Sequence, residues 1–66
     1  MAREVAMSGA AFVAWQDRMG WDNSETARQL GLGSRHTVIA YRRNGAPRFI
    51  ALACAALARG LKPTDV

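Results

Sequence analysis

The segment from Ser24 to Gly45, SETARQLGLGSRHTVIAYRRNG, constrains the fold of this chain more than any other part. Ser24 and Ser34 are preferred N-cap residues, and Gly31 suits the left-handed backbone that ends many helices. Asn44-Gly45 is a strong stop and turn signal. The segment therefore predicts two short helices joined by a turn that contains glycine.

Comparable signals divide the rest of the chain into helices. Ser8 can cap a first helix that Gly20 stops, and Pro47 suits the first turn of a last helix that Gly60 closes. We find no strand pattern, repeat or linker. The sequence thus predicts one all-α domain over residues 1–66, with four to five helices that include approximately residues 8–19, 24–31, 34–43 and 47–59.

Apolar residues at helical spacing predict which side chains form the core. The first helix is expected to bury Ala11, Phe12, Trp15 and Met19. It is expected to turn outward Gln16, Asp17 and Arg18. The central pair is expected to bury Ala27, Leu30, Val38 and Tyr41. Trp21, in the first connection, is expected to close the side of this core.

The charge distribution favours a polyanionic partner. The net charge is +4, and the five acidic residues are Glu4, Asp17, Asp22, Glu25 and Asp65. Between Thr26 and Thr64 there is no carboxylate, and this span holds seven of the nine basic residues: Arg28, Arg35, Arg42, Arg43, Arg48, Arg59 and Lys62. Such a surface attracts phosphate groups, although a merely basic soluble surface would have the same composition.

The composition argues against several classes of protein. Half of the 66 residues are hydrophobic, which suits a small core, although a domain this short buries only roughly 60% of its unfolded surface. Cys54 is the single cysteine and His36 the single histidine, so we expect neither an internal disulfide nor a metal site. No acid–base pair or activated nucleophile is recognisable. We therefore expect no enzyme activity, no cofactor and no small-molecule ligand.

The sequence shows no recognisable targeting or membrane-spanning segment. The first residues, MAREVAM, do not resemble a signal peptide, and no apolar run is long enough to span a bilayer. We therefore expect a cytoplasmic protein with no membrane partner.

The second helix of the central pair has an outward side that suits DNA. With Val38 and Tyr41 pointing inward, a rotation of about 100° per residue turns the opposite side toward solvent. Arginine pairs with guanine O6 and N7 in the major groove, and small apolar side chains contact thymine methyl groups. The predicted base-reading residues are Arg35, His36, Ile39 and Ala40.

Phosphate contacts are expected from a different set of residues. Hydroxyl and amide groups at helix N-termini form anion sites, and arginines near the far end of the helix lie where the sugar–phosphate backbone would pass. The predicted phosphate contacts are Ser24, Thr26, Ser34, Thr37, Arg42, Arg43 and Arg48.

The last helix, with the sequence FIALACAALAR, is apolar nearly all round. One apolar stripe contains Phe49, Ile50, Ala53 and Leu57. Leu52 and Ala56 form a second apolar stripe, which must also be buried against something, since an exposed apolar face is unfavourable. Two explanations stay open at this point: the first helix covers both stripes, or a partner protomer is bound by Phe49, Leu52 and Ala56.

Three stretches together resemble a known family. They are Ala27-Arg28-Gln29-Leu30-Gly31-Leu32, Ser34 to Tyr41, and Pro47-Arg48-Phe49-Ile50-Ala51-Leu52-Ala53. The pattern A-x-x-L-G-[LV]-x-S-x-x-T-V-x-x-Y, followed by P-x-x-[IV]-A-L-A, is similar to small helix-turn-helix regulators of the lambda-repressor/Cro type (XRE-like). The resemblance covers roughly residues 12–61. Gly33 in the turn, and Arg42-Arg43-Asn44 before Gly45, depart from it by lengthening two connections.

This resemblance implies a lambda-repressor-like domain that binds an inverted repeat in double-stranded DNA as a homodimer, with its third helix in the major groove. Small proteins of this type are often repressors encoded by phages or mobile elements, and anti-CRISPR-associated autorepressors are of similar size. It therefore implies a bacterial or phage-infected host cell.

The sequence thus predicts a DNA-binding transcriptional regulator, which acts as a homodimeric repressor or autorepressor on an inverted repeat. Two other classes remain open from the residues alone. One is a non-catalytic protein-interaction module, and the other is an architectural or RNA-binding basic protein. The salt and sequence dependence of nucleic-acid binding separates the three.

Overall fold

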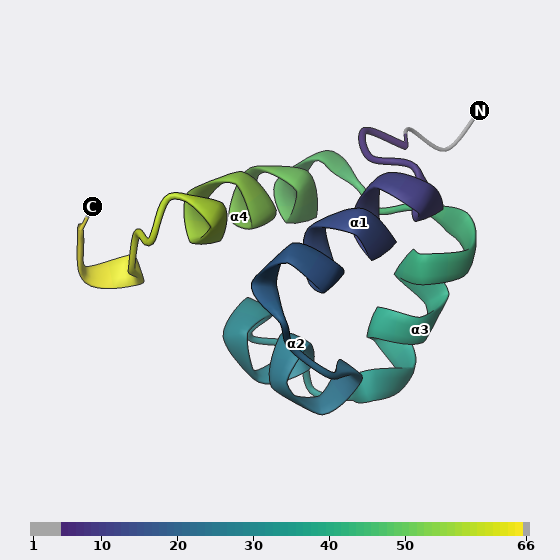
Figure 1. The fold of residues 1–66 in the computed structure, drawn as a ribbon, viewed down its shortest axis with the longest axis horizontal. Coiled ribbons are helices and arrows are strands. Elements are labelled where there is room, and N and C mark those ends of the chain that lie inside the picture. Colours follow the sequence, from purple (N-terminus) through teal and green to yellow (C-terminus); the bar gives the residue numbers. More distant parts are fainter. Residues whose placement is uncertain (1–4, 66) are drawn as a thin grey trace.

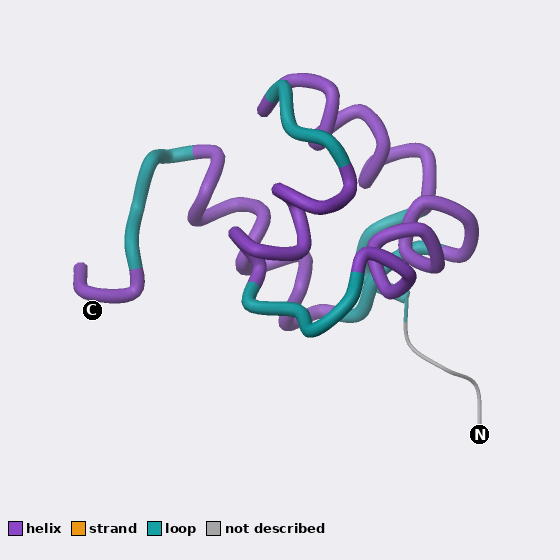
Figure 2. The backbone as a smooth tube through the Cα atoms, turned by 90° about the horizontal axis from the view of Figure 1, so that it is seen from below, coloured by secondary structure: helices purple, strands orange, loops and turns teal. Residues whose placement is uncertain are grey.

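Four α-helices and a short 3-10 helix make up the part of the chain that the computed structural model describes, residues 5–65 (Figure 1). The elements are α1 (Gly9–Met19), α2 (Asn23–Leu30), α3 (Arg35–Asn44), α4 (Arg48–Ala58) and η1 (Pro63–Asp65). Loops connect them, and no strand occurs within residues 5–65 (Figure 2). The predicted all-α class is confirmed. Residues 1–4 and 66 of the predicted domain, which include Glu4, lie outside the described residues.

Most of the expected cap residues form the helix ends. The hydroxyl oxygen of Ser8 accepts a hydrogen bond from the amide of Ala11 at 3.0 Å, at the start of α1. Ser34 caps α3 in the same way, with the amide of His36 as donor. Gly31 ends α2 with φ +75°, which an L side chain would adopt only with strain. These signals could be predicted because a cap depends on neighbours in the sequence.

Two helix starts differ from the prediction. The N-cap of α2 is Asp22, whose Oδ1 accepts a hydrogen bond from the amide of Glu25 at 2.8 Å, so Ser24 lies inside the first turn. Aspartate and serine are both preferred caps, and the extended backbone at Asp22 (φ −78°, ψ 179°) decides between them. Pro47 is the N-cap of α4 rather than a residue of its first turn, so α4 begins at Arg48.

The core lies between α1, α2, α3 and the buried side of α4. Its buried apolar residues are Phe12, Trp15, Ala27, Val38, Ala46, Ile50 and Cys54. The Phe12 ring lies 5.4 Å from the Trp15 ring and 5.7 Å from the Tyr41 ring, between ring centres. Trp21 packs edge-on against Trp15 at 5.8 Å, which closes the side of the core as expected. Met19, Leu30 and Tyr41 are half-buried.

The buried side of α1 is rotated from its predicted position. Gln16 is buried and Ala11 is exposed, the reverse of the expectation for both residues. The observed buried stripe runs through Phe12, Trp15, Gln16 and Met19, which is the ideal i, i+3, i+4, i+7 spacing of one helix face. A polar residue occupies one of its four positions because folding supplies it with hydrogen-bond partners.

The start of α1 is held close to the end of α3. Met7 and Ala46 form an isolated antiparallel bridge, in which the Ala46 amide donates to the Met7 carbonyl oxygen at 2.8 Å. A Cβ atom at Gly9 would lie 2.5 Å from the carbonyl oxygen of Arg42, so only glycine allows this approach. These contacts orient α3 at its C-terminal end.

One side of α4 is left uncovered. Phe49 is 67% exposed and Leu52 is 60% exposed, whereas Ile50 and Cys54 are buried in the core. The alternative that the first helix covers both apolar stripes is therefore wrong. Figures 1 and 2 show that α4 leads away from the other helices toward the C-terminal η1.

Candidate nucleic-acid interface

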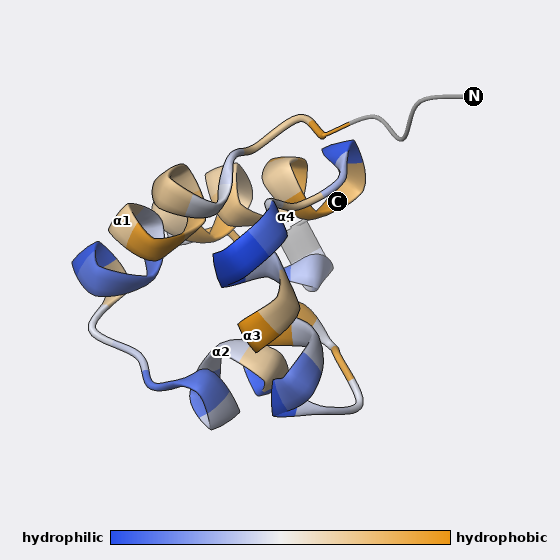
Figure 3. Cartoon of the chain, turned by 90° about the vertical axis from the view of Figure 1, so that its right-hand side faces the viewer, coloured by the Kyte–Doolittle hydropathy of each residue, from blue (hydrophilic) through white to orange (hydrophobic). Residues whose placement is uncertain are grey.

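The outer side of α3 forms one face of the molecule. Val38 is fully buried, whereas Ile39, the next residue, is 37% exposed. The exposed residues on the outer side of α3 are Arg35, His36, Ile39, Ala40 and Arg43. Figure 3 faces α3 and shows a hydrophobic stretch of this helix beside strongly hydrophilic residues. The structure thus brings the four predicted base-reading residues to one accessible side of one helix.

The N-termini of α2 and α3 lie on either side of a shallow cavity of about 340 Å³. The residues that line it are Asp22, Asn23, Ser24, Arg35, His36 and Ile39. A neighbouring cavity of about 400 Å³ is also lined by Ser24 and Arg35, together with Ser34. Five predicted phosphate- or base-contacting residues therefore gather at the openings of α2 and α3: Ser24, Ser34, Arg35, His36 and Ile39. Asp22 is the carboxylate at this edge, and it is used as the N-cap of α2.

Ser34 fixes the orientation of His36 as well as capping α3. Its Oγ accepts the His36 backbone N–H and lies 3.0 Å from Nδ1 of the same residue. When the serine hydroxyl donates to Nδ1, the neutral imidazole carries its proton on Nε2. The ring then presents a hydrogen-bond donor to solvent, which suits an acceptor such as a phosphate oxygen or a guanine edge.

Thr26 is not available for the phosphate contact predicted for it. Its side chain is fully buried, and its Oγ1 donates to the backbone carbonyl of Asp22 at 2.8 Å. The residue lies beside Ala27 on the core side of α2, whereas Ser24 is exposed. The hydroxyl therefore stabilises the first turn of α2, and the sequence-based assignment is wrong.

Arg42 is joined to a buried polar network that the sequence analysis did not identify. Its Nη1 donates to Oε1 of Gln16 at 2.6 Å, although the two residues are 26 positions apart. The Gln16 amide donates in turn to the Trp21 carbonyl at 3.2 Å and to Asn23 Oδ1 at 3.0 Å. The network connects α1, the α1–α2 connection, the start of α2 and the end of α3. The phosphate contact predicted for Arg42 stays a prediction, and it would have to use the guanidinium N–H groups that do not bond to Gln16.

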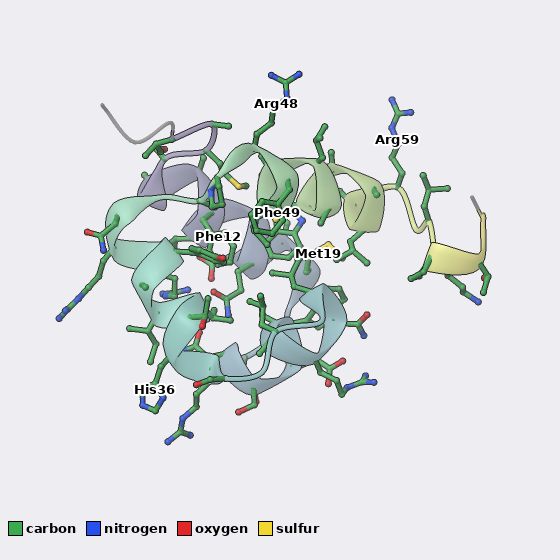
Figure 4. The ribbon with its side chains drawn as sticks, turned by 180° about the vertical axis from the view of Figure 1, so that it is seen from behind. Phe12, Met19, His36, Arg48, Phe49 and Arg59 are labelled. Atoms are coloured by element: carbon green, nitrogen blue, oxygen red, sulfur yellow. The ribbon has the colours of Figure 1, made fainter. Side chains whose placement is uncertain are left out.

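The remaining predicted phosphate contacts are separated. Arg43 is exposed on α3 and Thr37 is half-buried there. Arg48 lies at the start of α4, and Figure 4 shows it pointing away from the end of the molecule where His36 lies. The structure therefore does not bring Arg48 together with the N-terminal part of α3.

Arg28, which lies in the span from Thr26 to Thr64 that contains no carboxylate, forms an ion pair with Glu25 just outside that span. The guanidinium of Arg28 donates to Glu25 through Nε at 3.1 Å and through Nη2. Hydrogen bonds from Arg28 and then from Gln29 hold the pKa of Glu25 below its ordinary value, and Glu25 raises the pKa of Arg28. The charge of Arg28 is thus balanced locally, which leaves the α3 arginines as the stronger source of positive potential.

Two other kinds of site have no support in residues 5–65. No group of three or more His, Cys, Asp or Glu side chains there is arranged to hold a metal ion. No helix in that range has the length and apolar character needed to cross a bilayer.

A scan against protein-family models gave no match, and searches of the curated proteins and of the solved structures gave no significant match.

Proposed function

We propose that this chain is a sequence-specific double-stranded DNA-binding regulator of the helix-turn-helix type. In this proposal α3 is the recognition helix and lies in the major groove, while α2 lies across its inner side. The protein acts as a homodimer on an inverted repeat and represses transcription by occluding a promoter.

A single observation carries the proposal: the side of α3 that holds Arg35, His36, Ile39 and Ala40 is exposed, and the opposite side anchors the helix to the core through Val38. A major groove about 12 Å wide admits one α-helix presented in this way. An exposed isoleucine between basic residues is unfavourable in water, and the thymine methyl groups of a groove would cover it.

The residue types suit the two kinds of contact that DNA requires. Arg35 can pair in bidentate fashion with guanine O6 and N7, and each good pair of this kind contributes about 1–3 kcal/mol of discrimination. Ser24 and Ser34 lie at the openings of two helices, where free amides favour a phosphate oxygen. Arg43, one helical turn beyond Ile39, can meet the backbone at the edge of the groove.

Random-site selection with purified protein tests the proposal, followed by titration of the selected duplex and of a scrambled duplex. We expect one recurrent inverted repeat. Arg35→Ala should lose about 10- to 150-fold in affinity for the selected site, because about 1–3 kcal/mol of base discrimination is lost, and should relax the preference at one base pair of each half-site.

Arg59→Ala is the matched control, since it removes the same charge from the far end of α4. Figure 4 shows Arg59 pointing away from the body of the molecule, on the side opposite His36. We expect its affinity to change little. Equal losses for the two variants, or tight binding without any recurrent site, would favour an architectural protein. No salt-dependent binding at all would favour a protein-interaction module.

A further inference from the structure

The two most exposed large apolar side chains within residues 5–65, Phe49 and Leu52, lie on α4 rather than on α3. Besides Phe49 and Leu52, Leu61 is 48% exposed just beyond the helix. No charged residue occurs in α4 after Arg48, its first residue, and the next one along the chain is Arg59. Exposed apolar surface of this kind marks an interaction site on a small domain.

The side chains on the uncovered side of α4 are large at the start of the helix and small toward its end. Positions 49, 53 and 56 are three or four residues apart, as are 49, 52 and 56, so all four lie on one side of the helix, next to the buried side that holds Ile50. The first half of this seam carries the large side chains of Phe49 and Leu52. The second half carries only the methyl groups of Ala53 and Ala56.

A mostly apolar cavity of about 310 Å³ lies beside the small half of the seam. Its apolar walls include Leu30 from α2 and Ala53, Ala56, Leu57 and Leu61. The same helix therefore presents large protruding side chains at one end and an apolar hollow at the other. A surface with both features can be complementary to itself.

We propose that the uncovered side of α4 binds a second copy of this chain, with the two α4 helices antiparallel about a two-fold axis. Phe49 of one copy then packs on the partner's Ala56 and enters the cavity beside it, while Leu52 packs on the partner's Ala53. Both pairs are centred between positions 52 and 53. A parallel pairing would instead place Phe49 on Phe49 and leave a void between the alanines, which close packing disfavours.

The antiparallel arrangement is compatible with the position of α3. A two-fold axis perpendicular to α4 and directed toward α3 places the α3 helices of both copies on the same side of the dimer. In Figure 4, His36 lies at the end of the molecule opposite Arg48 and Arg59, and these two arginines point away from it. Neither guanidinium needs to be buried by the pairing. This inference rests on the proposed function, because the pairing would place two recognition helices on one duplex.

The expected dimer is weak. α4 has 11 residues and is about 16 Å long, so one helix pair falls below the area of a standard stable interface, roughly 1,200–2,000 Å². We therefore expect a monomer–dimer equilibrium with a dissociation constant on the order of micromolar or weaker, which DNA would shift toward the dimer.

Sedimentation equilibrium without DNA, from low micromolar to near-millimolar protein, tests the pairing. The wild type should change from monomer to dimer over this range. Leu52→Glu should remain monomeric, because it places a charge in the centre of the seam. Ala58→Glu, exposed on the side of α4 that points away from the seam, should dimerise like the wild type. Circular dichroism verifies that both variants are folded. A wild type that stays monomeric, or equal effects of the two variants, would overturn the proposal.

Cysteine cross-linking tests the direction of the helices. In a Cys54→Ala background, Leu52→Cys lies next to the axis and should oxidise to a disulfide-linked dimer. Phe49→Cys should not, since an antiparallel pair separates the two copies of position 49 by roughly 10 Å along the helix, beyond the reach of a disulfide. Cross-linking at position 49, whether or not position 52 also cross-links, would indicate parallel helices and contradict the proposal.

These measurements separate the pairing from the proposed function. A dimer that forms through α4 and binds no DNA would support the pairing and contradict the DNA-binding function. A protein that binds a single half-site specifically and stays monomeric would do the reverse.

Discussion

At the scale of single residues, Val38 and Ile39 show that two consecutive residues of one helix can have different roles, one in the core and one on the surface. Val38 is fully buried and Ile39, one position later, is exposed. Because neighbouring residues in a helix point about 100° apart, one side chain anchors α3 while the next is free to bind. This division could be predicted from the sequence, since it depends on helical geometry alone.

Cys54 gives a residue-scale prediction for pH dependence. Burial raises the pKa of its thiol to about 11, from an ordinary value of 9.0. Well below pH 9 the thiol is neutral in both states, so its burial carries no pH-dependent cost. As the pH rises from 9 toward 11, the unfolded chain loses this proton more readily than the folded chain, and stability should fall. Urea unfolding of wild type and Cys54→Ala at several pH values measures the difference.

The Cys54→Ala variant should be less stable by an offset that is constant below pH 9, because it leaves a small cavity. Its disadvantage should shrink between pH 9 and 11, where only the wild type carries the thiol titration. A constant difference across the whole range would show that the thiol is not effectively buried.

Gln16 and Thr26 could not be assigned correctly from sequence. Both are polar residues on helices, and both are almost fully buried. Their partners explain the burial: Thr26 bonds to the Asp22 carbonyl, and Gln16 bonds to Arg42 from a distant helix. A periodicity argument assigns polar residues to the surface, because it contains no information on hydrogen bonds that form only after the helices pack.

At the scale of elements, the Gln16 network holds α3 in position against α1 and α2. Replacing Gln16 with leucine leaves the half-buried Arg42 without this partner and removes both amide donors. We expect Gln16→Leu to lower the free energy of unfolding by about 1–3 kcal/mol, the cost of leaving buried polar groups unsatisfied. Gln29→Leu, on the exposed surface of α2, should change it by less than about 0.5 kcal/mol. Denaturant unfolding that gave equal effects would exclude a structural role for the network.

The approach of α1 to α3 makes a second element-scale prediction. Gly9→Ala should destabilise the fold despite the higher helix propensity of alanine, because its Cβ would lie 2.5 Å from the Arg42 carbonyl oxygen. Gly33→Ala meets nothing within 4 Å and should be neutral or stabilising, by up to about 1 kcal/mol. Thermal unfolding compares the two variants, and a stabilised Gly9→Ala protein would contradict the close packing.

The elements themselves were largely predictable. The four helices, and the caps at Ser8, Gly31 and Ser34, follow from local signals. The start of α2 differs from the prediction because two good cap residues, Asp22 and Ser24, lie close together. The sequence does not determine which side of α4 is uncovered, since only the packed structure shows which apolar stripe the other helices cover.

At the scale of the whole molecule, the extents of 35 × 24 × 22 Å suit one half-site of a duplex. A copy bound one helical turn away, about 34 Å, would lie on the same side of the DNA. The α3 surface and the α4 seam are formed by different residues, so the proposed DNA binding and the proposed pairing would not compete for them.

The salt dependence of binding belongs to this scale, because it counts phosphate contacts. The logarithm of the association constant should fall steeply and linearly with the logarithm of salt concentration. Arg43→Ala should reduce that slope by about one and weaken selected and scrambled sites alike. Arg59→Ala should leave the slope unchanged. Equal slopes for these two variants would place the phosphate contacts elsewhere.

The central claim, that the outer side of α3 enters a DNA duplex, is tested most directly by nuclear magnetic resonance. Uniformly ¹⁵N-labelled protein would be titrated with the selected duplex while the backbone amide signals are followed. We expect the largest shifts at Arg35 to Ala40 and at Ser24, with small shifts on the buried side of α1. Shifts concentrated on α4 with α3 unchanged, or no shifts at saturating duplex, would contradict it.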